Sequence, residues 1–261
     1  MSRTPRDPEG RMPLREHLVE IRKRVVRIAL GLLVGAILGW IIYDPLLDAL
    51  MRPLEAAADR RGALIGLNFD GVATAMDIRV KVSLFLGVIV SSPWWLYQVF
   101  AFVNPGLTGK ERRYVYGFLC AAVPMFLAGA GLAWYVLPYV VEVLNDFVPE
   151  GGANLVGAQL YLSFVMRLIL ACGIAFLVPV FMVVLNLMGT VRATTWLAGW
   201  RWAILISFLF AAIVTPTMDV LSMFGIAAPI CALYFVATGL CFLHDRRADR
   251  RRVAPVDAAV E

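Results

Sequence analysis

The sequence predicts an all-α integral membrane protein with six membrane-spanning helices. Of its 261 residues, 61% are hydrophobic and only 16% are charged, whereas soluble domains are about half apolar and a quarter charged. The hydrophobic residues also come in long blocks, which is typical of a chain that crosses a bilayer several times. A third observation, the distribution of the basic residues, predicts which ends of the helices face the cytoplasm.

The six spans are predicted from the apolar blocks at roughly residues 25–43, 80–103, 114–140, 161–187, 202–214 and 220–243. The fifth block has 13 residues, or about 20 Å of helix, and a hydrocarbon core is roughly 30 Å thick. This span therefore either borrows residues from before Arg201 or leaves the bilayer locally thin. Prolines at 93, 124, 179 and 229 are expected to kink their helices, and Pro138 to end the third one.

Three polar segments flank or separate these blocks. In residues 1–24, an amphipathic helix is predicted from Pro13, with its apolar stripe along the membrane surface. Residues 44–79 are rich in turn formers and are predicted to be a loop whose leucines cover the membrane rim. Residues 244–261 are predicted to be a cytoplasmic, disordered tail.

Arginine and lysine are unequally divided between the two sides of the predicted bundle. The side that holds both termini (residues 1–24, 104–113, 188–201 and 243–261) carries 17 of them, and the opposite loops carry 4. The positive-inside rule therefore places both termini in the cytoplasm. Because the basic residues gather in termini and loops in this way, the net charge of +5 does not indicate nucleic-acid binding.

Enzymatic function is not expected from the residues available. The four cysteines lie in apolar blocks without a CxxC spacing and are predicted to be packing residues. Both histidines, His17 and His244, lie outside the apolar blocks, and there is no HExxH or GxSxG motif. A small secondary transporter is the alternative class, but the chain shows no internal repeat, and its membrane charges (Arg27, Lys81 and Arg167) lie near span ends.

Four segments carry a resemblance to a known family. They are HLVEIRKR at 17–24, PWWLYQVFAFVNPGLTGKERR at 93–113, YLSFVM at 161–166 and TPTMDVLS at 215–222. In this order they resemble the TatC family, the polytopic subunit of the twin-arginine protein translocase of the bacterial plasma membrane. The resemblance implies a cup of six tilted helices that binds twin-arginine signal peptides of folded proteins. It also implies single-span partners of the TatA and TatB kind, self-association, transport driven by the proton-motive force, and no cofactor.

Glu111 is the first candidate for signal-peptide binding. A ligand with two adjacent arginines needs carboxylates, because the planar guanidinium pairs with them through two parallel hydrogen bonds. The segment Thr108-Gly109-Lys110-Glu111 also fits a capping box, in which Glu111 caps the third span. The resemblance favours the peptide contact, and both roles are compatible.

Glu20 is the second candidate, by resemblance to the glutamate of the family's HLxELR motif. From spacing alone, an i,i+4 ion pair with Arg24 is the simpler interpretation, worth about 0.2–0.5 kcal/mol. Arg22 and Arg113 match basic positions beside these acids and are expected either to orient the carboxylates or to act as topology signals.

Other family positions carry weaker expectations. Pro53 and Asp219 lie on the far side, and Asp219 matches the acid of a TPxD turn, where capping of the sixth helix is an equal alternative. In the fourth span the family often has Glu or Gln, in a stretch like FEVPV that meets a partner helix. Here the stretch is FLVPV at 176–180, with Leu177 in place of the polar residue. Partner binding is therefore expected to depend on packing or on other polar residues.

Overall fold

The computed structural model describes residues 14–61, 65–68, 71, 73–103, 112–146, 154–215 and 220–257. Ten helices and two short strands lie in these ranges. They are α1 (Leu14–Ile41), α2 (Tyr43–Arg61), β1 (Ile65–Asn68), α3 (Thr74–Val90), α4 (Ser92–Val103), α5 (Arg112–Asp146), β2 (Asn154–Gly157), α6 (Ala158–Ala175), α7 (Leu177–Leu187), α8 (Ala193–Ala198), α9 (Trp200–Val214) and α10 (Val220–Asp257). The predicted all-α class is thus correct except for one pair of four-residue strands.

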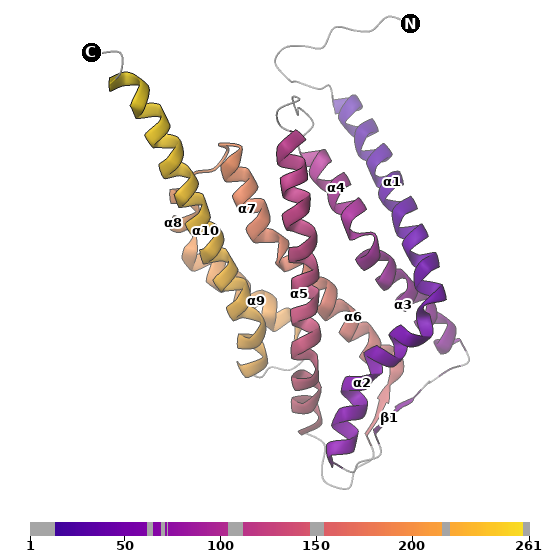
Figure 1. Ribbon diagram of the computed structural model, residues 1–261. Helices are drawn as coiled ribbons and strands as arrows, with labels where there is room; N and C mark the ends of the chain where they lie inside the picture. Colours follow the sequence, from indigo (N-terminus) through magenta and orange to yellow (C-terminus); the bar gives the residue numbers. More distant parts are fainter. Residues whose placement is uncertain are drawn as a thin grey trace, which may run out of the picture. The chain divides into compact units, whose positions relative to one another are not determined.

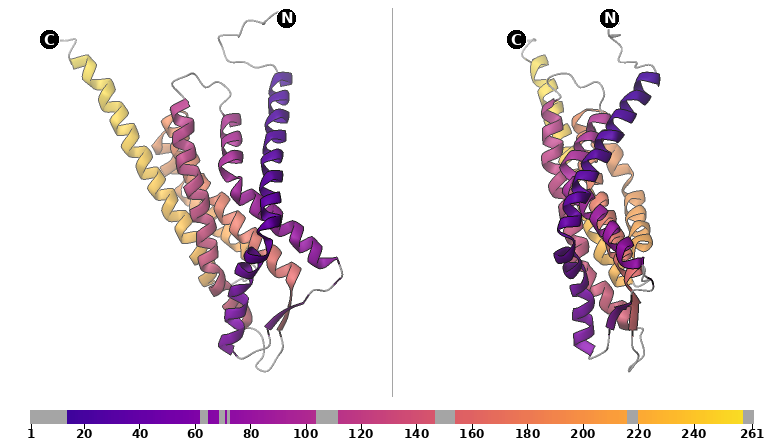
Figure 2. Two further views of the ribbon diagram at one scale, coloured as in Figure 1. Left: turned by 45° about the vertical axis from the view of Figure 1, so that its right-hand side comes forward. Right: turned by 90° about the vertical axis from the view of Figure 1, so that its right-hand side faces the viewer.

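The chain forms two compact units. The first comprises residues 1–43 and 79–123, and the second comprises residues 44–78 and 124–261. In the first unit α1 packs against α4, and the two helices lie side by side in Figures 1 and 2. Apolar side chains such as Leu96, Phe100 and Phe118 are buried in this unit.

In the second unit α10 packs along α9, α7 and α8, as Figures 1 and 2 show for the yellow helix and its orange neighbours. Strands β1 and β2 pair in parallel, with Ile65 opposite Asn154. The Tyr161 hydroxyl of α6 donates a hydrogen bond to the Leu50 carbonyl of α2 at 3.1 Å, and both residues are buried.

The described helices supply four segments that are long and apolar enough to cross a membrane. They are Leu18–Ile41, Gly117–Val143, Ala158–Leu187 and Ser222–Arg247, and the pair Thr74–Val90 and Ser92–Ala101 makes a fifth if it is one bent span. The remaining apolar helix, α9, has 15 residues, or about 22 Å. It starts two residues before the predicted span and remains short for a bilayer.

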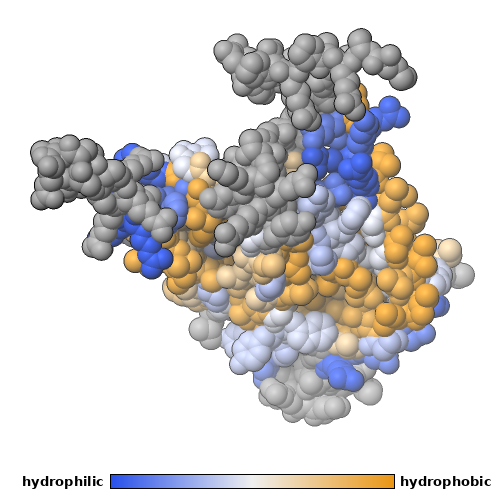
Figure 3. All heavy atoms as spheres, turned by 45° about the horizontal axis from the view of Figure 1, so that its top comes forward, coloured by the Kyte–Doolittle hydropathy of each residue, from blue (hydrophilic) through white to orange (hydrophobic). Residues whose placement is uncertain are grey.

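Exposed hydrophobic side chains are abundant on these helices. Ile41, Leu160 and Ile213 are each more than 70% exposed, and orange hydrophobic residues cover much of the described surface in view in Figure 3. In water such a surface would be unfavourable, so the arrangement indicates contact with lipid.

Two of the predicted proline kinks coincide with helix breaks. Helices α3 and α4 meet at an angle of 61°, directly before Pro93, whose ring has no N–H for the preceding turn. The break between α6 and α7 falls at Phe176, three residues before Pro179. Helices α5 and α10 continue through Pro124, Pro138 and Pro229, so the prediction that Pro138 ends the third span is wrong.

Three predicted polar segments are more helical than expected. The amphipathic helix of residues 13–24 is not a separate surface helix, because α1 runs without interruption from Leu14 to Ile41. Half of the predicted loop at 44–79 is α2, with Pro45 in its first turn, where a missing N–H costs nothing. The tail predicted to be disordered is helical to Asp257.

Candidate functional site

Glu20 lies on the N-terminal part of α1 and is paired with Arg24. Both Nε, at 3.0 Å, and Nη2 of Arg24 donate to Oε1 of Glu20. The Glu20 side chain is 25% exposed. The i,i+4 pair expected from spacing is therefore present. Both of these contacts use one carboxylate oxygen, so the other oxygen can accept hydrogen bonds from a further cation.

The structure describes the other predicted signal-peptide contacts only in part. Arg22 is exposed on α1, two residues from Glu20. Arg113 is the second residue of α5, with its backbone helical, and Glu111 lies outside the described residues, immediately before α5 along the chain. The structure therefore describes one of the two predicted carboxylates.

The indole of Trp94 on α4 is hydrogen-bonded to the backbone of α1. Nε1 of Trp94 donates a hydrogen bond to the Arg27 carbonyl at 2.9 Å. Gly31 lies one turn further along α1, and a Cβ there would collide with the Trp94 ring. The glycine thus allows the indole to lie against the backbone of α1 and to reach the carbonyl of Arg27, which is seven residues beyond Glu20.

Helix α4 is fastened to α5 by two aromatic rings. Phe100 and Phe118 stack with their centroids 4.1 Å apart and their planes at 15°, and both side chains are almost fully buried. These contacts join α1, α4 and the start of α5, which belong to one compact unit.

The predicted far-side and partner residues lie in the second unit. Pro53 is within α2, and Asp219 lies outside the described residues. Leu177 is the first residue of α7, and its side chain is 95% buried by the chain itself. In this conformation its side chain is not presented to a partner helix.

A polar cluster that was not predicted joins α7, α8 and α10. The buried Asn186 donates from Nδ2 to Oδ1 of Asp245 at 2.9 Å and to the Val191 carbonyl at 3.0 Å. Oδ2 of Asp245 accepts a hydrogen bond from the Ala193 N–H at 2.9 Å, which caps α8. Nδ1 of His244 lies 3.2 Å from Oδ1 of Asn186, and it donates a hydrogen bond to this oxygen when it carries a proton.

The segment between α7 and α8 is shaped to fit this cluster. Gly189 has a φ of 74°, and its N–H donates to the Asn186 carbonyl at 2.8 Å, so the helix ends in the left-handed conformation that glycine favours. The hydroxyl of Tyr234 on α10 also donates to the Trp196 carbonyl of α8. One signal in the sequence was available, since Asn186 is a polar residue at the end of an apolar span.

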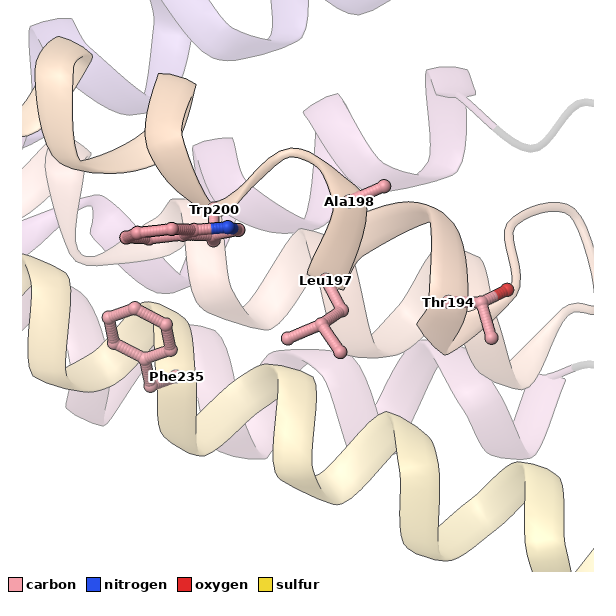
Figure 4. Close-up of a pocket in the computed structure, with 5 residues that line it drawn as sticks. All are labelled: Thr194, Leu197, Ala198, Trp200 and Phe235. Carbon is pink, nitrogen blue, oxygen red and sulfur yellow. The ribbon is translucent and has the colours of Figure 1, made fainter.

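An apolar groove of about 550 Å³ lies beside α8. It is lined by Thr194, Leu197, Ala198, Trp200 and Phe235, and the rings of Trp200 and Phe235 lie near each other in Figure 4. None of these side chains is a general acid or base at neutral pH. Among the described residues no group of three His, Cys, Asp or Glu side chains is placed to hold a metal ion, and the four cysteines are unpaired.

These features define a class of protein. It is a multi-pass membrane protein in which polar groups such as Asn186 and Asp245 form hydrogen bonds between helices. The matched family model, Sec-independent protein translocase protein (TatC), covers residues 16–229. The chain belongs to this family. It is a multi-pass component of the bacterial Tat protein translocase, with a role in transport.

Individual relatives cover nearly the whole chain. The TatC of Xylanimonas cellulosilytica is 59% identical over 248 residues, which are 95% of this chain and 90% of the relative. The TatC of Rothia mucilaginosa is 35% identical over 94% of this chain and 84% of its own length. Two crystal structures described as the twin arginine translocase receptor TatC, one of them in DDM, match with TM-scores of 0.70 and 0.75. They are 27% and 28% identical, over 87% and 86% of this chain and 98% and 99% of theirs.

Proposed function

We propose that this protein binds twin-arginine signal peptides of folded proteins and nucleates the translocation complex. The observation that carries the proposal is the Glu20 carboxylate, held by α1 in the same compact unit as the start of α5. The solved relatives are described as twin arginine translocase receptors. A peptide guanidinium would pair with the second oxygen of Glu20 or displace Arg24 from the first.

Glu111 is proposed as the second carboxylate, with Arg22 and Arg113 orienting the two acids. Two adjacent peptide arginines then each find one acid, and Lys-Lys peptides bind less well because an ammonium ion lacks the planar fork. The proposal includes six spans with both termini in the cytoplasm, single-span partners of the TatA and TatB kind, self-association, and export driven by the proton-motive force. Pro53 and Asp219 would lie on the far side.

Partner binding is proposed to rely on packing or on polar residues other than position 177. Leu177 is buried within its own chain, so a partner helix would meet it only after α7 had moved. Substitution of Leu177 by glutamine and by lysine, followed by co-purification of TatA-like and TatB-like proteins, tests this point. Co-purification that is unchanged in both variants would exclude position 177 as a partner contact, whereas loss with lysine but not with glutamine would indicate that a partner helix packs there.

The central test measures binding of labelled Arg-Arg and Lys-Lys signal peptides to the purified protein in detergent. The variants are Glu20→Gln, Glu111→Gln and, as a matched control, Arg24→Gln. If the Glu20 carboxylate binds the peptide, Glu20→Gln should reduce the preference for Arg-Arg over Lys-Lys peptides. Arg24→Gln should keep or strengthen this preference, because Arg24 no longer competes with the peptide for Glu20. If Glu20→Gln and Arg24→Gln have the same small effect, Glu20 serves only as an ion-pair partner.

A further inference from the structure

The residues around Arg79 form a feature that the proposed function does not use. Cζ of Arg79 lies 4.8 Å from the ring centroid of Trp40 and 4.9 Å from that of Tyr43. All three residues belong to the first compact unit. Two aromatic rings at these distances attract the guanidinium, because the negative face of each ring faces a positive charge.

The guanidinium is not otherwise satisfied within the described part of the chain. Its Nε is buried and has no hydrogen-bond partner there, and no described carboxylate forms an ion pair with it. Cation–π contacts use the face of the guanidinium, whereas hydrogen bonds to an anion use its N–H edge. The two aromatic contacts therefore leave donors for a second, anionic ligand.

An apolar groove adjoins this cation. Its volume is about 360 Å³, within the range of roughly 300–1,000 Å³ of pockets that hold small molecules, and Ala36, Ile37, Trp40, Ile41, Val80, Ser83 and Leu84 line it. Trp40 belongs to both features, and Val80 follows Arg79 directly. The only hydroxyl, that of Ser83, is already bonded to the Arg79 carbonyl at 2.7 Å, so the groove presents an apolar surface.

We propose that this cation and groove bind one phospholipid molecule, with its phosphodiester on the guanidinium of Arg79 and an acyl chain in the groove. The occupant must combine an anion with a long apolar chain, and a phospholipid does so. Phosphate oxygens accept the paired N–H groups of arginine. Trp and Tyr are also the side chains that membrane proteins place at the level of the headgroups, where the phosphodiester lies.

Native mass spectrometry of the purified full-length protein tests the site. We expect wild type to retain one phosphatidylglycerol tightly, and Arg79→Gln to bind it about tenfold more weakly. Arg79→Lys should lie between them, because lysine keeps the charge but not the fork. Arg27→Gln is the matched control, since Arg27 is exposed in the same unit and has no ring contact in the described residues. It should leave retention within twofold of wild type.

Further arms separate the possible ligands. Diacylglycerol with the same chains should be retained about tenfold less than phosphatidylglycerol, and inorganic phosphate should not displace the lipid. Retention of phosphatidylglycerol by Arg79→Gln at the wild-type level overturns the proposal. So does equal retention of the two lipids, or displacement by phosphate alone.

A second variant keeps the test decisive if Arg79→Gln does not fold. Leu84 is 51% exposed, so Leu84→Trp can fill the groove from its open side without disturbing a packed core. It should reduce retention at least fivefold. Leu33, 57% exposed on α1, is not part of the groove lining, and Leu33→Trp should have no such effect. Equal retention by the two tryptophan variants excludes the groove as the binding site.

Discussion

Substitution of Gly35 by alanine should weaken the contact between α1 and α3. An ideal Cβ on Gly35 would lie 2.7 Å from the Gly87 carbonyl oxygen and 2.9 Å from its Cα. A Cβ on Gly87 would in turn lie 2.8 Å from the Ala36 nitrogen, whereas ordinary contact begins at 3.4 Å. All of these neighbours are backbone atoms, so no side-chain rotation can relieve the overlap.

The two helices would therefore have to separate by up to about 0.7 Å. A gap of 0.5–1 Å loses a quarter to a half of the dispersion energy between facing atoms, and such overpacking costs roughly 1–3 kcal/mol. Alanine at the same time gains about 1 kcal/mol of helix propensity over glycine. The net effect of Gly35→Ala should be a loss of up to about 2 kcal/mol.

Gly239 on α10 offers a matched control. No atom lies within 4 Å of a Cβ built on it, so Gly239→Ala should have only the propensity gain, up to about 1 kcal/mol of stabilisation. Thermal unfolding in detergent, measured for both variants and for Gly87→Ala, shows whether each substitution raises or lowers the stability of the protein. The reasoning is refuted if Gly35→Ala and Gly87→Ala stabilise the protein as much as Gly239→Ala does.

Three further predictions concern side-chain contacts. Asp245→Asn removes one of the two carboxylate oxygens that accept hydrogen bonds from Asn186 and Ala193, and it should lower the unfolding free energy by about 1–3 kcal/mol. Asp249 is exposed on the same helix, and Asp249→Asn, the control, should change the unfolding free energy by less than about 0.5 kcal/mol. Trp94→Phe loses the bond to Arg27 and should cost about 1 kcal/mol by thermal unfolding, and Trp134→Phe, whose indole has no bond among the described residues, less than half of that. Phe118→Ala leaves a cavity in place of a buried ring and should lower the unfolding free energy by roughly 3–5 kcal/mol. It should also weaken the binding of Arg-Arg peptides. Unchanged peptide affinity would show that the α4–α5 contact does not position the binding site.

Local patterns were predictable because they depend on neighbours in the sequence. Long apolar blocks indicated the spans, and the i,i+4 spacing of Glu20 and Arg24 indicated their ion pair. Helix α2 was missed because Pro45 and Pro53 were interpreted as turn formers. Pro45 fits the first turn of a helix, and α2 continues through Pro53. The separation of Leu46 and Leu50 by one helical turn was the better guide, since Leu50 is fully buried.

Contacts between distant segments were not predictable in the same way. Asn186 and Asp245 are 59 residues apart, and neither residue alone indicates the other. The same holds for Arg79 and Trp40, whose contact depends on how closely α1 and α3 approach. Hydrophobic periodicity predicts which face of a helix is buried, but not which polar groups meet when two helices pack.

The division into two units bears on how a receptor of this kind would work. The described receptor candidates, Glu20 and Arg22, lie in the first unit, as does the backbone of Arg113. The unit's internal contacts, Trp94 with Arg27 and Phe100 with Phe118, run from α1 through α4 to α5. Two carboxylates bind two adjacent arginines most tightly if the distance between the carboxylates is fixed, because flexible groups lose conformational entropy when a ligand binds. A peptide site within one unit would have that distance set by the unit's own contacts.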